Sequence, residues 1–322
     1  MTTTPPPAAG ATPAPASSAA VWSALWVVYL IWGSTYLAIA IAIESMPPLL
    51  ALGTRFLAAA ALLALFLGVR RGPRVLVVPW PEVRGAAVVG VLLLGIGIGT
   101  LTLAERYVPT GVAALLVAVV PLWVVLLRAG TGDRPHLITW TGVVLGLAGV
   151  AVLVLPGEHV EAVGGATSAQ RTLWSLLVLA SSACWAIGSF LQPRIRTPRD
   201  PLVLTTYEMV AGGIALCLVG VLRGERLTDF ADATVRSWSG WIYLVTFGSL
   251  LGFTAFVWLL SHAPLSLVTT YAYVNPVVAV ALGFLVLAEP LTVGVVVGGA
   301  IVVAGVVLVV SGERVGGRQV RD

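Results

Sequence analysis

Charged side chains are scarce in this sequence: Asp, Glu, Lys and Arg make up 10% of its 322 residues, against about 25% in a typical soluble domain. Hydrophobic residues make up 58%, and the mean hydropathy is +1.00. So few charges could not cover a surface that faces water, which excludes a soluble globular protein. Lysine is absent, and the 18 arginines are scattered rather than striped along one face, which excludes a nucleic-acid partner.

Cysteine and histidine are also rare. The two cysteines, Cys184 and Cys217, both fall in long apolar stretches, and the three histidines lie far apart in the sequence. A disulfide framework or a zinc site needs more such residues at short spacings. The sequence also lacks a Walker lysine motif, a serine nucleophile elbow and a His-Glu-x-x-His pair. We therefore expect no metal, no cofactor and no enzymatic activity.

What the sequence has instead is a series of apolar stretches that are each long enough to cross a bilayer, which takes about 20 residues. We predict an all-α integral membrane protein with ten transmembrane helices, five in each half of the chain. The predicted spans are 22–43, 49–69, 85–104, 109–128, 137–155, 172–192, 202–222, 239–260, 265–287 and 291–311.

The two halves of the chain repeat each other. Pro48 and Arg55 are echoed by Pro201 and Glu208, and the offset between the halves stays between 153 and 156 positions along the chain. Because five is an odd number of spans, the second repeat must enter the membrane inverted, a common design of secondary transporters. The predicted organisation is a disordered tail over 1–19, a first repeat over 20–156, an outer linker over 157–171, a second repeat over 172–312 and a cytoplasmic tail over 313–322.

The placement of arginine predicts the orientation. With the N-terminus inside, the cytoplasmic connections and tail hold twelve arginines and the outer connections hold five. The positive-inside rule therefore favours cytoplasmic N- and C-termini. We predict a multi-pass protein of the cell (inner) membrane, surrounded by lipid.

Polar residues in membrane spans mark an interior lined by protein, because they are costly in hydrocarbon. The fifth and tenth spans hold long runs of apolar residues and glycine. Their spacings, Gly142 to Gly146 and Gly294 to Gly298, allow helix backbones to approach closely. We predict that these spans lie outside the central path as packing elements, or as the interface of a homodimer, so that the chain is a monomer or a homodimer. The predicted substrate-binding residues, drawn from the polar and aromatic positions of the other spans, are Trp32, Ser34, Tyr36, Arg55, Trp185, Ser189, Tyr271, Tyr273 and Asn275.

Three ionisable residues inside or beside the spans carry alternative interpretations. Arg55 and Glu208 are each about 10 Å deep, since each lies seven residues after the proline that opens its span. Arg55 is a candidate substrate contact and Glu208 a candidate proton carrier or cation contact, unless they pair with each other or with a helix end as structural ions. Glu105 is a second candidate carrier, or one half of a solvated charge pair with Arg106 at the outer interface.

Prolines and glycines within the spans have mechanical interpretations. Pro121 and Pro276 remove a backbone hydrogen bond and predict helix kinks. The segment 271–276 (YAYVNP) offers aromatic faces and an amide beside a freed carbonyl, which predicts a surface of the binding cavity rather than an interfacial aromatic belt. The glycines at 95, 97 and 99 indicate helix packing. Asp133 and Glu289 fit first-turn acids that complement helix dipoles.

Several longer motifs resemble a known family. The segments 31–36 (IWGSTY), 44–48 (ESMPP) and 55–56 (RF) resemble the first repeat of the EamA-type drug/metabolite transporters. The segment 270–278 (TYAYVNPVV) resembles the second repeat, particularly that of the YedA-like inner-membrane permeases. The resemblance implies two inverted five-helix repeats, alternating access and the export of amino acids or other metabolites. It also implies that the fifth and tenth helices lie outside the cavity.

The leading hypothesis is therefore a secondary active transporter that exports small metabolites, such as amino acids, or drugs, and that is coupled to protons. One alternative is an exchanger of phosphorylated sugars or nucleotide sugars, but a phosphate in a membrane cavity asks for several cations and Arg55 is alone within a predicted span. Another is a non-transporting scaffold, which would not need polar residues deep in its spans.

Overall fold

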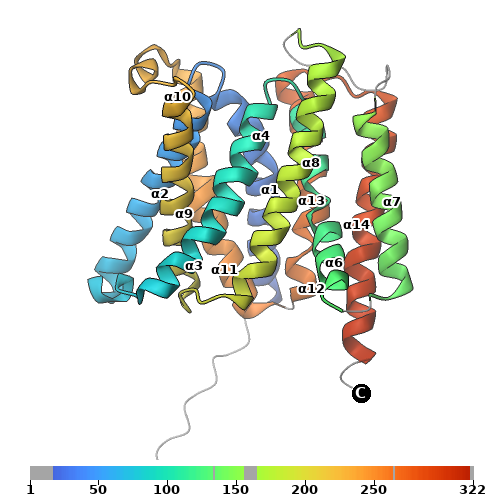
Figure 1. Cartoon of the computed structure of the whole chain (residues 1–322), viewed down its shortest axis with the longest axis horizontal. Coiled ribbons are helices and arrows are strands. Elements are labelled where there is room, and N and C mark those ends of the chain that lie inside the picture. The colour runs from blue at the N-terminus through green and yellow to red at the C-terminus, as the bar shows by residue number, and fades with distance from the viewer. Residues whose placement is uncertain (1–16, 133–134, 156–164, 264, 320–322) are drawn as a thin grey trace, which may run out of the picture.

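The computed structural model describes residues 17–132, 135–155, 165–263 and 265–319, so most of the predicted N-terminal tail lies outside the described residues. Within these ranges every regular element is a helix (Figure 1). The first half holds α1 (Ser18–Ala42), α2 (Pro48–Arg71), η1 (Pro73–Leu76), α3 (Trp80–Gly90), η2 (Val91–Ile98), α4 (Gly99–Ala104), α5 (Thr110–Val117), α6 (Val120–Gly130) and α7 (Leu137–Val154). The second half holds α8 (Ser168–Leu191), η3 (Gln192–Arg194), α9 (Pro201–Leu222), η4 (Leu227–Asp232), α10 (Val235–Tyr243), η5 (Leu244–Leu251), α11 (Gly252–His262), α12 (Leu265–Val268), α13 (Tyr271–Leu287) and α14 (Val293–Gln319).

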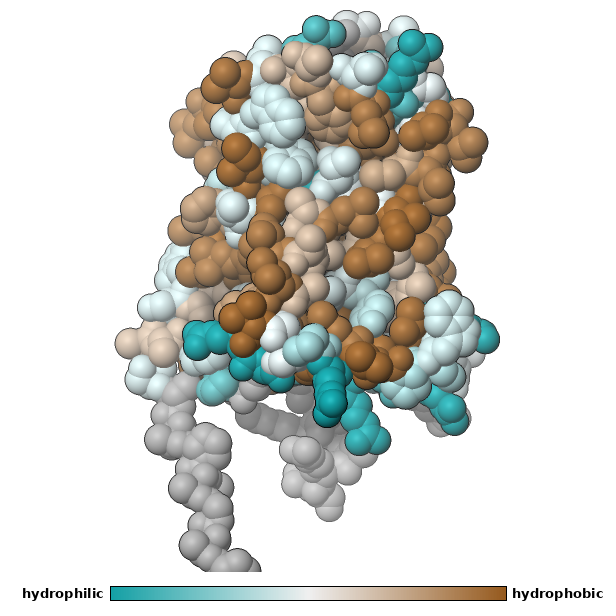
Figure 2. All heavy atoms as spheres, turned by 90° about the vertical axis from the view of Figure 1, so that its left-hand side faces the viewer, coloured by the Kyte–Doolittle hydropathy of each residue, from teal (hydrophilic) through white to brown (hydrophobic). Residues whose placement is uncertain are grey.

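Among the described residues, nine helical stretches are long and apolar enough to cross a membrane. Each coincides with a predicted span. The remaining predicted span, 265–287, is divided into the single turn α12 and the shorter apolar helix α13. On the face shown in Figure 2, hydrophobic side chains cover the middle of the molecule and hydrophilic residues gather toward its two ends. This distribution of surface polarity is that of a multi-pass membrane protein.

The two ends of the helix bundle can be named by the helix α2. The end where α2 begins, at the top of Figure 1, is called here the Pro48 end. The opposite end, where α2 finishes, is called the Arg71 end. The start of α1 and the end of α14 both lie at the Arg71 end, so the chain crosses the bundle an even number of times.

Two long helices contain a π-helical stretch at corresponding places in the two halves. Trp80–Ala104 is helical throughout, with i→i+5 hydrogen bonding over η2, and the second-half helix formed by α10, η5 and α11 has the same bonding over η5. The segment η2 packs against α8 and α9, whereas η5 packs against α1 and α2. Each π-helical segment therefore lies against the first two helices of the other half. Such segments are frequent at functional sites.

The helices α7 and α14, which coincide with the fifth and tenth predicted spans, pack side by side (Figure 1). A Cβ atom at Gly142 would lie 2.7 Å from the Gly305 carbonyl oxygen, and one at Gly149 would lie 2.9 Å from that of Gly298. Glycine is therefore required here for the two backbones to touch. The close packing predicted from glycine spacing is made within one chain, while a homodimer through these helices stays a prediction.

The two prolines singled out in the sequence differ in their surroundings. Pro121 lies in the first turn of α6, and the helix is interrupted just before it, at residues 118–119 between α5 and α6. Pro276 lies inside the continuous helix α13, and the interruption of that span comes earlier, at residues 269–270. The break in each span therefore precedes its proline, by a longer distance in the second half.

Candidate functional site

The helices α2 and α9 pack closely against each other, and small residues set their separation. A Cβ atom at Gly53 would lie 2.9 Å from the Gly213 carbonyl oxygen, and one at Gly213 would lie 3.0 Å from that of Gly53. The close approach places two buried ionisable side chains on the two helices, Arg55 at 5% exposure and Glu208 at 8%. These are the residues that occupy equivalent positions in the sequence repeat.

Arg55 is held by the π-helical segment η5. Its Nε donates a hydrogen bond of 3.2 Å to the Ser249 hydroxyl, and a Cβ atom at Gly248 would lie 3.3 Å from an Arg55 guanidinium nitrogen. A larger residue at position 248 would therefore press on the guanidinium. The cation is thus positioned between α2 and η5, where a hydrogen bond to a charged group is stronger than one between neutral groups.

Glu208 has no comparable support. Its Oε1 is buried and has no hydrogen-bond partner among the described residues. The backbone of Glu208 lies against Gly90, where a Cβ atom would be 2.3 Å from the Glu208 carbonyl oxygen, just before η2 begins. No ion pair joins Glu208 to Arg55 within the described ranges, and the roles of the two residues stay predictions.

An aromatic cluster occupies the contact between α1, α11 and α13. The Trp32 ring lies edge-to-face with Tyr271 and Phe253, both at 5.3 Å between ring centroids, and 5.0 Å from Phe256. Asn275 is buried on α13, and its Oδ1 has no hydrogen-bond partner among the described residues. The structure thus brings together Trp32 and Tyr271 and places Asn275 one helical turn further along α13.

The other predicted binding residues are spread over α1, α8 and α13. The Ser34 hydroxyl lies 2.6 Å from that of Tyr243, next to η5. Trp185 lies against η2, since a Cβ atom at Gly97 would be 3.1 Å from its ring. Ser189, Tyr36 and Tyr273 are partly buried, and the last two pack against the main hydrophobic core. The predicted residues therefore fall into separate groups, with Trp185 beside η2, Ser34 close to η5, and Trp32 and Tyr271 at the α1–α13 contact.

Glu105 is buried rather than solvated, which corrects its interpretation as a surface partner of Arg106. Its side chain is 5% exposed, and neither carboxyl oxygen has a hydrogen-bond partner in the described part of the chain. Glu105 lies one residue beyond the span Trp80–Ala104, where burial and then the neighbouring carboxylate of Glu289 raise its pKa well above the usual value. Sequence reasoning missed the burial because Glu105 stands beside an exposed arginine at a span end.

Two glutamates of the second half cap helices of the first half at the Pro48 end. Glu289 accepts hydrogen bonds from the backbone N–H and hydroxyl of Thr110, both at 2.7 Å, at the start of α5. Glu225 accepts from the N–H groups of Leu49 (3.2 Å) and Leu50 (2.8 Å) in the first turn of α2. Glu289 thus complements a helix dipole, but that of α5 rather than that of the helix that follows it. Asp133 lies outside the described residues.

The two caps share a local geometry. The backbone N–H of each glutamate donates to a glycine carbonyl in the preceding helix, Glu225 to Gly220 and Glu289 to Gly283. A Cβ atom at either glycine would lie less than 3 Å from the carboxylate. Each carboxylate therefore passes over a glycine to reach the other half of the chain. At the opposite end, an ion pair of Arg71 with Asp200 and a hydrogen bond from Tyr207 to the Leu76 carbonyl also join the halves.

Sequence reasoning did not select two polar residues that the structure places next to the candidate site, Tyr243 at the end of α10 and Ser249 in η5. Ser249 is 1% exposed and contacts Arg55, and Tyr243 contacts Ser34. Ser249 could have been selected because it is a polar residue within an apolar predicted span. Tyr243 lies near the expected start of its span, where a tyrosine also fits an interfacial position.

The fold and the buried polar groups define a polytopic helical membrane protein with ionisable side chains in its interior. The model of the EamA-like transporter family matches the chain twice, over residues 19–155 and 172–311. The chain therefore belongs to the EamA-like transporter family and is a membrane transporter of that family.

Individual relatives agree with this assignment. The chain is 38% identical over 267 residues to "Uncharacterized inner membrane transporter YedA" of Escherichia coli (strain K12), covering 82% of this chain and 81% of that protein. It is 29% identical over 299 residues to a "Probable terminal-alkyne amino-acid exporter" of Streptantibioticus cattleyicolor, covering 91% and 93%. A solved crystal structure of a protein shares the fold, with a TM-score of 0.58 over 93% of this chain and 99% of that chain, at 21% identity.

Proposed function

We propose that this protein exports small amphipathic metabolites, such as amino acids or drugs, as a secondary active transporter coupled to protons. The observation that carries the proposal is Glu208, a buried carboxyl with an unpartnered oxygen at the crossing of α2 and α9. Ionising such a group without a partner is costly, so it gives up its charge when its surroundings close and regains it when they open. A proton carrier needs this property.

The proposed mechanism is alternating access between two inverted five-helix repeats. The termini lie in the cytoplasm, so the Pro48 end faces outward. The segments η2 and η5 each pack against the other half of the chain, which supports a role for them at the moving contact between the repeats. Arg55, fixed by Ser249, serves as a contact for a substrate carboxylate, and Trp32, Tyr271 and Asn275 contact its apolar and polar parts. Glu105 is a second candidate carrier near the Pro48 end.

One relative, the probable terminal-alkyne amino-acid exporter, supports the amino-acid part of the proposal, because its sequence aligns with most of this chain. The test is accumulation in proteoliposomes under an imposed pH gradient, with a mixed panel of metabolites identified by mass. Accumulation of one solute class above empty liposomes supports the proposal and names the substrate. If no solute crosses while a partner protein co-purifies in stoichiometric amount, a scaffold role replaces transport. Accumulation of sugar phosphates alone would favour an exchanger.

A further inference from the structure

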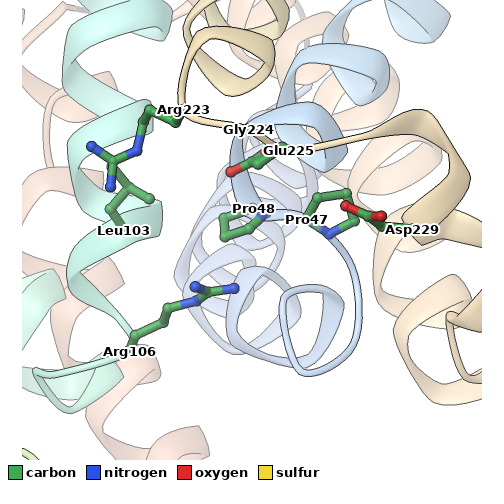
Figure 3. A pocket seen from close by; sticks show the side chains of 8 residues that line it. All are labelled: Pro47, Pro48, Leu103, Arg106, Arg223, Gly224, Glu225 and Asp229. Carbon is green, nitrogen blue, oxygen red and sulfur yellow. The ribbon is translucent and has the colours of Figure 1, made fainter.

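A hollow at the Pro48 end lies apart from the residues at the α2–α9 crossing. Its volume is about 310 Å³, at the lower end of the range for sites that bind small molecules. Three parts of the chain form it: the start of α2, the end of α4 with the residues just after it, and the segment that runs from the end of α9 into η4 (Figure 3). The lining residues are Pro47, Pro48, Leu103, Arg106, Arg223, Gly224, Glu225 and Asp229.

Two cations and two anions face this hollow without neutralising each other. Arg106 and Arg223 are exposed arginines, and Figure 3 shows the side chain of Arg106 reaching toward Pro48 and that of Arg223 lying beside Leu103. Within the described ranges, neither arginine makes an ion pair with Glu225 or Asp229. Arginine readily forms bidentate pairs with carboxylates, so two free guanidinium groups beside two acids are in need of an explanation.

The explanation lies in how the acids are held. Glu225 is fixed by the N–H groups of Leu49 and Leu50, and Asp229 accepts a hydrogen bond of 2.9 Å from the Arg226 N–H. Backbone donors thus position both carboxylates along one wall of the hollow. Carboxylate oxygens can accept more than one hydrogen bond each, so both acids keep capacity for a further donor.

The rest of the hollow is rigid and apolar. Pro47 and Pro48 have no backbone N–H and fixed φ angles, and Leu103 is partly buried beside them. Gly224 turns the chain with a positive φ of 89°, a conformation that favours glycine, and so places Arg223 and Glu225 on the same hollow. The hollow therefore offers separate positive, negative and apolar contacts on a fixed frame.

We propose that this hollow binds a small zwitterion, a molecule that carries one carboxylate, one ammonium group and a modest apolar part. Arg106 and Arg223 contact the carboxylate, Glu225 and Asp229 contact the ammonium group, and Pro47, Pro48 and Leu103 contact the apolar part. A simple anion would face two acids, and a simple cation would face two arginines, so only a ligand with both charges matches the lining. The inference rests on the proposed transport function, in which the hollow is a binding site at the outer mouth of the path.

The test is direct binding to the purified full-length protein in nanodiscs. The probes are radiolabelled glycine, leucine and phenylalanine, together with two analogues of leucine: 4-methylpentanoate, which lacks the ammonium group, and 3-methylbutylamine, which lacks the carboxylate. The variant is the double substitution Arg106→Gln with Arg223→Gln. The matched control is Arg236→Gln, which removes an exposed arginine of the first turn of α10 that does not line the hollow. Thermal unfolding checks that every variant is folded.

We expect leucine to bind more tightly than either analogue. The double variant should weaken leucine binding by at least about tenfold, because charge-assisted hydrogen bonds are stronger than neutral ones. Arg236→Gln should bind like the unchanged protein. The inference is overturned if no zwitterion binds, if an analogue binds as tightly as leucine, or if the double variant retains its affinity.

Transport in proteoliposomes separates this inference from the proposed function. If a zwitterion crosses with the same concentration dependence in the double variant, the binding site is wrong while the transporter stands. If leucine binds and the double variant loses that binding, yet no solute of the panel crosses, the site stands and the proposed function is wrong.

Discussion

The second helix of each half carries one buried ion at the same place, but the two ions have different surroundings. Arg55 and Glu208 each lie seven residues after the proline that begins their helix, α2 or α9. Arg55 donates to Ser249, a buried residue of η5, whereas Glu208 keeps a buried oxygen without a partner in the described residues. At the place in η2 that corresponds to Ser249 stands Ile96, which is 40% exposed. The two halves therefore share the position of the ionisable residue but differ in the hydrogen bond that holds its side chain.

This difference fits two separate functions for the repeated unit, substrate recognition by Arg55 and proton transfer by Glu208. A cation held by a neighbouring hydroxyl has a fixed direction, which suits the recognition of a carboxylate. A buried carboxyl without a partner is costly to ionise, which suits the uptake and release of a proton. The comparison predicts that removing the free acid abolishes coupling, and that removing the supported cation, or only its support, has graded effects on substrate binding.

The largest effect is expected for Glu208→Gln, which keeps the size of the side chain and removes its ability to carry a proton. Accumulation driven by a pH gradient should fall to the level of empty liposomes, while the protein stays folded. The measurement is uptake into proteoliposomes as a function of pH. A matched control is Glu82→Gln, in the first turn of α3 and partly exposed, which should transport normally. An unchanged rate and pH profile in Glu208→Gln would remove Glu208 as the carrier.

The next effect is expected for Arg55→Gln, which removes the charge next to η5. The apparent affinity for a carboxylate substrate should fall about tenfold or more, because a charged hydrogen bond contributes about 1.5–3 kcal/mol. The apparent affinity of Arg55→Lys should lie between that of the unchanged protein and that of Arg55→Gln, because lysine keeps the charge and loses the planar guanidinium. The measurement is the concentration dependence of transport at fixed pH. Equal affinity in all three proteins would mean that Arg55 does not contact the substrate.

A smaller effect is expected for Ser249→Ala, which leaves the Arg55 cation in place and removes its hydrogen-bond acceptor. The apparent affinity should fall by about fivefold, corresponding to a net hydrogen bond of about 1 kcal/mol. Thr246→Ala is the control, because Thr246 lies on the same segment and its hydroxyl donates to the Ile242 carbonyl in an exposed position. A loss in Ser249→Ala as large as that in Arg55→Gln would show that the hydroxyl itself contacts the substrate.

Much of the fold follows from the sequence, because long apolar stretches and small-residue spacings report directly on membrane spans and helix contacts. The packing of α7 against α14 is one example, since Gly142 and Gly149 are needed by the backbone of the other helix. The π-helical stretches could not be predicted, because their extra residue leaves no mark in an apolar segment. The burial of Glu105 depends on tertiary packing that no local pattern encodes, and Glu289, whose carboxylate raises its pKa further, is distant in the sequence.

The smallest effect is expected at the two carboxylate caps, where the second half of the chain holds helices of the first half. Glu289→Gln replaces a charged cap of α5 by a neutral one, and Glu225→Gln does the same at α2. Each substitution should lower the free energy of unfolding by about 1 kcal/mol, which corresponds to a decrease of about 2–4 °C in the midpoint of thermal unfolding. Glu44→Gln is the control, because its ion pair with Arg236 is exposed and contributes little. Midpoints equal to that of the control would show that the caps do not hold the two halves together. Lower midpoints with faster transport would show that the caps restrain the moving contact.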